Sequence, residues 1–287
     1  IYGLHSRITK FPDVVTADVL DRESLVKAMA GVDSVIHLAA KKAVGESVEN
    51  PLKYYENNFG GTLNILAAMK IAGVKKIVFS STAAVYSPSE KPAITEEDST
   101  IPLSPYGATK LLSEQLISNV SSAEGFSCVS LRYFNVAGSG SDEMGDNSRD
   151  NLVPKVFLAI TNGERPEVFG TDYPTPDGTC IRDYIHVSDL ARAHIDALKA
   201  VEKSRIDEIY NVGSGNGFSV TEVMTEIEKA MGKNLNPILG PRRAGDSPKL
   251  IASIEKISRD LGWKPKHTLR DMITSSWSAW QSQGGSR

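Results

Sequence analysis

Cysteine is scarce in this chain. Cys128 and Cys180 are its two cysteines, far apart and without the spacing of a metal site. We therefore expect no disulfide framework and no metal, and we predict a reducing, cytoplasmic compartment. No apolar run approaches the ~18 residues that a membrane helix needs, and we expect no signal peptide. The net charge of −3 provides no general attraction to nucleic acid or membranes.

Strands alternate with helices in the first half of the chain. Residues 32–40, 75–86 and 126–138 are β-rich runs, and the first two end in small or polar residues. Residues 58–73 and 104–125 are predicted helices that each stop at a glycine. This alternation predicts βαβ units and a parallel sheet, an α/β fold. Ligands of such sheets bind beyond the carboxyl ends of the strands.

The second half of the chain follows a different pattern, which indicates a smaller lobe. Proline and glycine mark a loop at 172–179, and residues 180–201 read as a strand that turns into a helix. Three further helices are predicted at 151–163, near 219–232 and near 253–262.

A glycine-rich turn is missing from the start of the sequence. A nucleotide-binding sheet normally opens with a strand, that turn and a helix, whereas this chain opens IYGLHSRITKFPDVV. We read residues 11–21 as a later strand that ends in Asp18. At least one βα unit of roughly 30–40 residues is therefore expected to be missing before it. Truncation, residues absent from this sequence, or fragments joined across gaps would each explain the opening.

Tyr106 and Lys110 stand one helical turn apart, so their side chains share a face about 6 Å apart along the axis. A phenol with a pKa near 10 is a poor base at neutral pH. An adjacent ammonium favours the phenolate, which is then able to take a hydroxyl proton. The alternative is an exposed lysine beside a half-buried tyrosine, because this spacing often occurs by chance.

The loops after the two preceding strands carry residues that strengthen the catalytic interpretation. Ser80, Ser81 and Thr82 follow a strand one βα unit before the tyrosine, where a hydroxyl can bridge to substrate. The alternative is that these hydroxyls satisfy the last amides of the strand. At the end of the run 32–40, the small residues Ala39 and Ala40 allow a cofactor to approach the backbone, and Lys42 is either a ribose ligand or a surface lysine.

Several long motifs, in order, resemble the UDP-glucose (UDP-galactose) 4-epimerases of the extended short-chain dehydrogenase/reductase family. The resemblance runs from about residue 14 to near the C-terminus. The motifs are HLAAKKAVGES, YYENNFGGT, FSSTAAVYS, SPYGATK, LRYFNVAG, FGTDYPTPDGTCIRDYIHV and PRRAGD.

The resemblance implies a fold and two domains. The fold is a Rossmann-type doubly wound parallel sheet with a smaller α/β substrate-binding lobe. An NAD-binding domain covers 1–135, to which 181–214 returns, and 136–287 mainly bind the nucleotide sugar. A homodimer in which helices such as 59–72 and 107–123 pair with their copies is also implied. No nucleic acid or membrane partner is expected.

The resemblance also implies a mechanism in which NAD stays bound throughout. Tyr106 deprotonates the sugar 4-hydroxyl, Lys110 lowers the pKa of this tyrosine and holds the nicotinamide ribose, and Thr82 relays the proton. Hydride passes from C4 to the nicotinamide, giving a 4-keto sugar and NADH. The keto sugar then turns about its pyrophosphate and receives hydride on its other face.

Further residues match binding positions of the family. The cofactor positions, with Tyr106 and Lys110, are Asp18, Val19, Leu38, Ala39, Ala40, Lys42, Asn58, Ser80 and Phe134. The substrate positions, with Lys42 and Thr82, are Asn135, Asn151, Leu152, Val168, Phe169, Arg182, Arg243, Asp246 and Leu250. Guanidinium groups suit a diphosphate because they pair with its oxygens in a bidentate manner. Surface or interlobe ion pairs are the alternative for these arginines.

Three departures from the family pattern bear on this interpretation. Ser87 stands where the family often has glycine, a minor change in a turn. Leu250 matches the site whose size helps to decide whether an N-acetyl group fits, and its intermediate size leaves UDP-N-acetylhexosamines, or another nucleotide sugar, open as substrates. The third departure is the missing glycine-rich turn, which normally binds the NAD pyrophosphate.

Two rival functions remain. A 4,6-dehydratase needs an additional acid and base, which relatives place directly after the motif threonine. Ala83 and Ala84 occupy those positions, so simple return of hydride is favoured. The second rival is a non-catalytic relative that only binds a dinucleotide, which is consistent with the missing glycine-rich turn. Such a protein would not need Thr82, Tyr106 and Lys110 together, so their presence argues against it.

Overall fold

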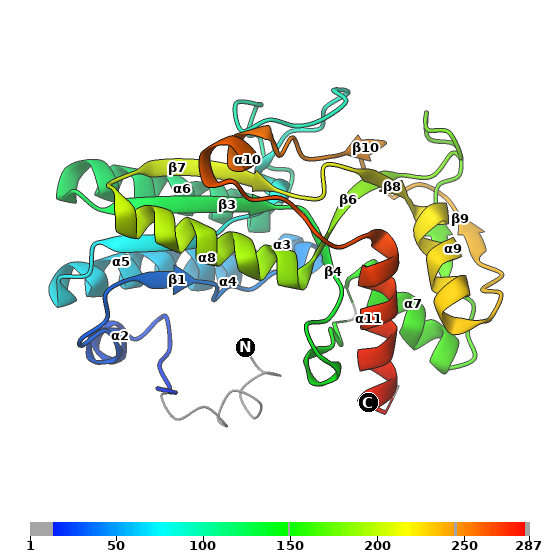
Figure 1. The fold of residues 1–287 in the computed structure, drawn as a ribbon, viewed down its shortest axis with the longest axis horizontal. Helices are drawn as coiled ribbons and strands as arrows, with labels where there is room; N and C mark the ends of the chain where they lie inside the picture. The colour runs from blue at the N-terminus through cyan, green and yellow to red at the C-terminus, as the bar shows by residue number, and fades with distance from the viewer. Residues whose placement is uncertain (1–13, 149, 244–245, 285–287) are drawn as a thin grey trace. The chain divides into compact units, whose positions relative to one another are not determined.

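The computed structural model describes residues 14–148, 150–243 and 246–284 (Figure 1). Its helices are α2 (Arg22–Ala28), α3 (Val44–Glu49), α4 (Pro51–Tyr54), α5 (Gly61–Ala72), α6 (Pro105–Glu124), α7 (Leu152–Thr161), α8 (Val187–Lys203), α9 (Val220–Met231), α10 (Glu255–Leu261) and α11 (Leu269–Ser282). A π-helical segment η1 (Tyr55–Gly60) precedes α5, and 3₁₀ turns form at η2 (Ala83–Val85) and η3 (Asp142–Met144).

The strands form three small sheets. They are β1 (Val35–His37), β2 (Lys76–Ser80), β3 (Ser127–Tyr133), β4 (Asn135–Ala137), β5 (Glu167–Phe169), β6 (Ile181–His186), β7 (Asp207–Val212), β8 (Gly217–Ser219), β9 (Ile238–Gly240) and β10 (Lys249–Leu250). One sheet has the order β1-β2-β3-β7, the second has the order β10-β6-β4 with β8 paired to β6, and β5 pairs with β9. The β1–β2, β4–β6, β10–β6 and β5–β9 pairs are parallel, which confirms the predicted parallel α/β organisation.

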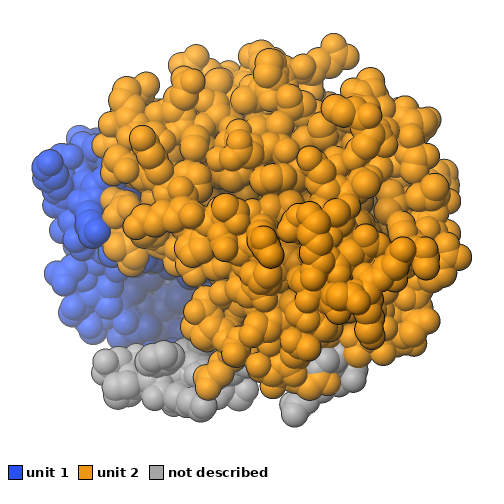
Figure 2. All heavy atoms as spheres, turned by 45° about the vertical axis from the view of Figure 1, so that its right-hand side comes forward, with its two compact units in different colours: residues 1–85, 100–130, 197–208 blue, residues 86–99, 131–196, 209–287 orange. Residues whose placement is uncertain are grey.

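The chain divides into two compact units, coloured separately in Figure 2. Unit 1 comprises residues 1–85, 100–130 and 197–208, and unit 2 comprises residues 86–99, 131–196 and 209–287. Each unit has a hydrophobic core of its own. Ile65 and Met69 of α5, Phe79 of β2 and Ile117 of α6 are central to that of unit 1, and all are at most 5% exposed.

Helix α6 begins and ends at residues that the sequence marks clearly. The Ser104 hydroxyl accepts a hydrogen bond from the amide of Gly107 at 3.2 Å, and Pro105 occupies the first helical position. Such an N-cap is worth about 1 kcal/mol. Gly125 ends the helix with a φ of 71°, a left-handed conformation that favours glycine. The predicted helix 104–125 is therefore confirmed.

Two strand predictions need correction. The run 11–21 is not a strand in its described part, because residues 14–18 have no regular secondary structure and 19–20 form a turn. Asp18 instead accepts a hydrogen bond from the Leu20 amide at 2.9 Å. Residues 11–13 lie outside the described residues. The predicted strand 126–138 is divided at Phe134 into β3 and β4, which belong to different sheets.

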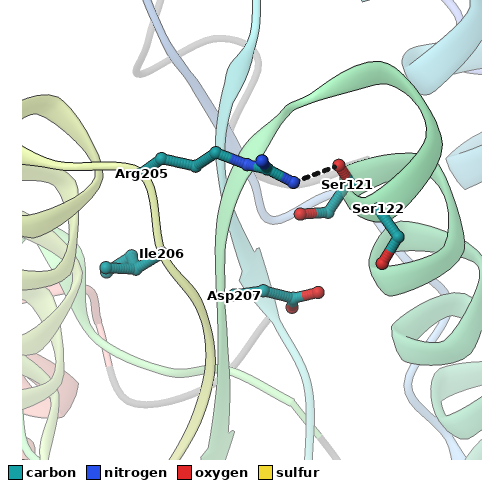
Figure 3. Close-up of a pocket in the computed structure, with 5 residues that line it drawn as sticks. All are labelled: Ser121, Ser122, Arg205, Ile206 and Asp207. Atoms are coloured by element: carbon teal, nitrogen blue, oxygen red, sulfur yellow. Dashed lines mark hydrogen bonds between the residues drawn. The ribbon is translucent and has the colours of Figure 1, made fainter.

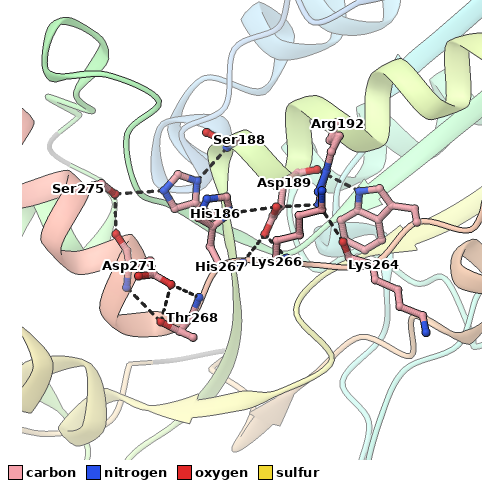
Figure 4. A network of polar contacts seen from close by, with 11 residues as sticks. His186, Ser188, Asp189, Arg192, Lys264, Lys266, His267, Thr268, Asp271 and Ser275 are labelled. Atoms are coloured by element: carbon pink, nitrogen blue, oxygen red, sulfur yellow. Dashed lines mark hydrogen bonds and ion pairs between the residues drawn. The ribbon is translucent and has the colours of Figure 1, made fainter.

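Helix α11 is held in unit 2 by a polar network that Figure 4 shows from close by. Asp189 is 1% exposed and accepts hydrogen bonds from the amides of Lys266 and His267 at 2.8 and 3.0 Å. The His267 ring stacks on His186, with their centroids 4.1 Å apart, and His186 Nε2 lies 3.1 Å from the Ser275 hydroxyl. These contacts join the end of β6 and the start of α8 to the first turns of α11.

Asp183 of β6 fastens three segments of unit 2. It is fully buried and accepts hydrogen bonds from the amide and hydroxyl of Ser214, both at 2.7 Å. Its second oxygen accepts from the amides of Gly215 at 3.0 Å and Ala252 at 3.1 Å. A carboxylate suits this site because all four partners are donors.

We expect Asp183→Asn to lower the free energy of unfolding by about 2–4 kcal/mol, because its NH2 group would face donors and leave them unpaired in the core. Urea unfolding of the wild type and the variant measures the difference. Asp260→Asn, a surface change beside Arg259, is the control and should cost less than about 1 kcal/mol. Equal effects of the two variants would contradict this role of Asp183.

Candidate active site

Lys110 is a buried cation in the second turn of α6. Its side chain is 3% exposed, and its Nζ donates a hydrogen bond to the Ser80 carbonyl oxygen at 2.8 Å. The ammonium also lies over the Phe79 ring, 4.7 Å from the centroid. Burial lowers the pKa of Lys110 to about 7, and the charge of Glu114 opposes this shift. Lys110 is thus fixed at the end of β2, the place where the sequence predicted the catalytic residues.

The turn that carries Thr82 packs closely on the first turn of α6. A Cβ atom on Gly107 would lie 2.3 Å from the Ala84 carbonyl oxygen, so only glycine permits this approach of the two backbones. Thr82 Oγ1 accepts a hydrogen bond from the Ala84 amide at 3.2 Å, which leaves its hydroxyl proton able to donate elsewhere. Tyr106, the residue before this glycine, is 8% exposed. The structure therefore brings together the elements that carry Thr82, Tyr106 and Lys110.

A second buried network supports the loop after β1. The side-chain amide of Asn58 bonds both the amide and the carbonyl of Lys41, at 2.8 and 3.0 Å, and donates to the Thr109 hydroxyl at 3.2 Å. Its backbone carbonyl accepts from Thr62, whose hydroxyl lies 3.1 Å from His37 Nε2. Asn58 therefore fixes the loop after β1 relative to α6, a structural role that its spacing in the sequence did not indicate.

The other predicted cofactor residues of unit 1 lie on more open surface. Leu38 is 60% exposed, Ala39 and Ala40 are half-buried, and Lys42 is exposed. Asp18 is exposed, and the Val19 carbonyl accepts a hydrogen bond from Asn64 of α5 at 3.1 Å. Ser80, in contrast, is fully buried and acts through its backbone carbonyl.

In unit 2, one group of predicted substrate residues gathers at β6 and β10. Arg182 pairs with Asp246 at 3.1 Å and donates to the Ser247 carbonyl at 2.8 Å. Leu250 lies beside Arg182 in the parallel ladder of these strands. Arg182 is therefore held by carbonyl and carboxylate groups at a half-buried position.

The remaining predicted residues of unit 2 lie on other elements. Arg243 stacks on the Phe169 ring at 3.7 Å, and the neighbouring Val168 is buried in β5. The other four are distributed as follows: Phe134 is buried, Asn135 is exposed in β4 opposite Tyr184, Asn151 donates to Asp146 at 2.6 Å, and Leu152 begins α7.

The pocket shown in Figure 3 is a separate feature of unit 1. It has a volume of about 280 Å³ and is lined by Ser121, Ser122, Arg205, Ile206 and Asp207. Ser121 is in the last turns of α6 and Tyr106 is in its first turn, so about 22 Å of helix separate them. The pocket therefore does not include the predicted catalytic residues.

Neither a metal site nor a membrane-spanning helix is found among the described residues. They contain no group of three or more histidine, cysteine, aspartate or glutamate side chains arranged to hold a metal ion. Within the same ranges, no helix has both the length and the apolar character that crossing a bilayer requires.

Comparison with known proteins identifies the class of protein first. Residues 1–213 match the model of the NAD dependent epimerase/dehydratase family. The chain belongs to this family.

Within that family the chain is similar to UDP-glucose 4-epimerases. It is 44% identical to that of Azospirillum brasilense over 94% of this chain and 78% of the relative. The structure of UDP-glucose-4-epimerase from Stenotrophomonas maltophila, with bound NAD and formylated UDP-arabinopyranose, has a TM-score of 0.91 at 37% identity, covering 97% and 85% of the two chains. The Bifidobacterium longum enzyme, in complex with NAD+ and UDP, has a TM-score of 0.87 at 40% identity, covering 97% and 86%. The predicted Rossmann-type fold and the resemblance are thereby confirmed.

The buried His37 beside this site should make the fold sensitive to acid. Burial, and secondarily the charge of Lys110, lowers its pKa to about 3 in the folded state from 6.5. Its contribution to stability is complete above pH 6.5 and is lost as the pH falls toward 3, because the unfolded chain binds the proton first. At pH 5 we expect a loss of about 2 kcal/mol relative to pH 7.

Urea unfolding of the wild type and His37→Gln at pH 7 and pH 5 tests this expectation. The variant keeps a group able to bond Thr62 but has no proton to gain, so the wild type should lose more stability on acidification. The same loss in both proteins would refute the assignment to His37.

Proposed function

We propose that this protein catalyses the NAD-dependent 4-epimerisation of UDP-glucose and UDP-galactose. The observation that supports this most directly is the packing of α6 on the turn after β2, which gathers Thr82, Tyr106 and Lys110 on buried, rigid elements. The similarity to UDP-glucose 4-epimerases over almost the whole chain supports the same reaction.

The residues at the ends of β1 and β2 fit NAD. Leu38 presents an exposed apolar side chain beside two alanines. Such an apolar surface is suited to packing against an aromatic ring of the cofactor. Asn58 fixes the loop that follows, which would let the backbone keep its place against a cofactor. We propose that these residues, with Asp18, Val19, Lys42, Ser80 and Phe134, hold the cofactor.

Tyr106 is the proposed base. It receives the proton of the sugar 4-hydroxyl as a phenolate, a form that the neighbouring Lys110 ammonium favours. Thr82 bridges the sugar oxygen and the phenol, because its hydroxyl proton remains able to donate. NAD, when bound, supplies the hydride acceptor and donor at C4. After the 4-keto sugar has turned, Tyr106 returns the proton.

The residues of unit 2 are proposed to bind the UDP part. Arg182 and Arg243 carry the positive charge that a diphosphate requires. The carboxylate of Asp246 limits the motion of Arg182, and the ring of Phe169 limits that of Arg243. The other proposed contacts are Asn135, Asn151, Leu152, Val168, Phe169, Asp246 and Leu250. As the family resemblance implies, the side chain of Leu250 is the proposed determinant of whether an N-acetyl group is accepted; it neighbours Arg182 in the ladder.

We also propose a homodimer located in the cytoplasm. Large apolar side chains are exposed on α6 and on helices packed against it: Leu52 of α4 is 82% exposed, Leu63 of α5 is 44% and Leu112 of α6 is 38%. A surface with such side chains suits an interface between two copies. The two cysteines are free and buried, in keeping with a reducing compartment.

Tyr106→Phe tests the proposed base. Loss of the phenol oxygen should lower epimerisation of UDP-galactose by about 10²–10⁴-fold, while NAD still copurifies, as measured by its absorbance after denaturation. Tyr210→Phe, which removes a phenol that no proposed step uses, should retain full activity. Near-normal turnover of Tyr106→Phe would eliminate Tyr106 as the base, and absence of turnover in the wild type would eliminate the proposed function.

Leu52→Asp combined with Leu112→Asp tests the dimer. Two charges would have to be desolvated in the interface, so sedimentation should show monomers at a concentration where the wild type is dimeric. Leu239→Asp, at a residue of β9 that is 66% exposed, is the control and should leave the mass unchanged. A wild type that sediments as a monomer, or a double variant that stays dimeric, would overturn the proposed interface.

A further inference from the structure

Glu114 is a buried carboxylate one helical turn beyond Lys110. Its side chain is 4% exposed, and Oε1 accepts a hydrogen bond from the fully buried Ser81 hydroxyl. A carboxylate is costly to bury unless it is hydrogen-bonded and lies near a positive charge. The proposed reaction steps do not use Glu114, so its burial needs another explanation.

Two adjacent residues of the turn after β2 hold two side chains of the same helix. The Ser80 carbonyl accepts from Lys110 at 2.8 Å, and the Ser81 hydroxyl donates to Glu114. Lys110 and Glu114 are four residues apart on α6, so they share one face. The turn continues directly to Thr82, whose position therefore depends on both attachments.

We propose that Glu114 is a positioning residue: its charge keeps the buried Lys110 protonated, and its bond to Ser81 holds the turn that carries Thr82 against α6. This role rests on the proposed epimerisation, in which Lys110 acts as a cation. It makes Glu114 the fourth functional residue of the site, acting through Lys110 and Thr82.

The electrostatics of unit 1 agree with this assignment. Burial lowers the pKa of Lys110 to about 7, and the negative charge of Glu114 acts in the opposite direction. His37 faces Lys110 from the end of β1 and stays neutral, because burial and Lys110 lower its pKa to about 3. Tyr106 precedes Lys110 by one turn on the same helix. In the proposed mechanism, the charge of Lys110 favours the phenolate form of Tyr106.

Two ion pairs involve helices packed on α6 and lie at the surface. Glu46 of α3 pairs with Lys53 of α4. Lys70 of α5 pairs with Glu124 at the far end of α6 at 2.5 Å. These pairs are partly exposed and compensated. The charge that acts on the pKa of Lys110 is that of Glu114.

Glu114→Gln separates charge from shape, because the amide oxygen is still able to accept the Ser81 hydrogen bond. The pKa of Lys110 is measured in the ligand-free protein by NMR titration of isotope-labelled lysine, with the signal assigned by its loss in Lys110→Met. We expect this pKa to fall by about 1 unit or more. The alkaline limb of the pH profile of kcat/KM should move to lower pH by a similar amount.

Glu124→Gln is the matched control. It removes the same charge from the same helix, about 15 Å beyond Glu114 along the axis, and should leave the pKa of Lys110 unchanged. If Glu114→Gln fails to fold, Ser81→Ala replaces it and should lower this pKa by a smaller amount. An unchanged pKa of Lys110 in the tested variant overturns the inference. Loss of the proposed function would show instead as a wild type without turnover, which leaves the NMR result unaffected.

Discussion

The hydrogen bond from Lys110 to the carbonyl of Ser80 is the interaction on which the interior of unit 1 depends. It brings a charge into the interior of unit 1 and fixes α6 at the carboxyl end of β2. Because an isolated buried charge is unstable, the surrounding groups have to be arranged to tolerate it. The Phe79 ring and the Glu114 carboxylate are two such groups.

The helices and strands around the proposed site could be predicted because the residues that mark their ends are close in the sequence. Ser104, Pro105 and Gly125 mark the ends of α6, and α5 stops at Gly73 as its sequence indicates. Alternation of strands and helices then predicted where the polar residues after β2 would lie.

What the sequence did not reveal depends on contacts between distant segments. Leu63 and Ile71 of α5 are apolar yet exposed, because the buried face of a helix is decided by what packs on it. Helix α11 was missed although Thr268 and Asp271 form a capping box, a usable signal. Glu114 was overlooked because burial of a helical glutamate becomes visible only when the facing turn is known.

The two alanines after Thr82 satisfy a packing requirement and a chemical one at the same time. Ala83 is 6% exposed, and the carbonyl of Ala84 leaves no room for a side chain on Gly107. Carboxylates at these positions would supply the acid and base for elimination, but they would also bring two charges to a tightly packed turn. With alanines there, a 4-keto sugar has no acid or base at these positions to start elimination, and its return to the alcohol is favoured. The turn that binds Lys110 therefore also directs the proposed reaction toward epimerisation.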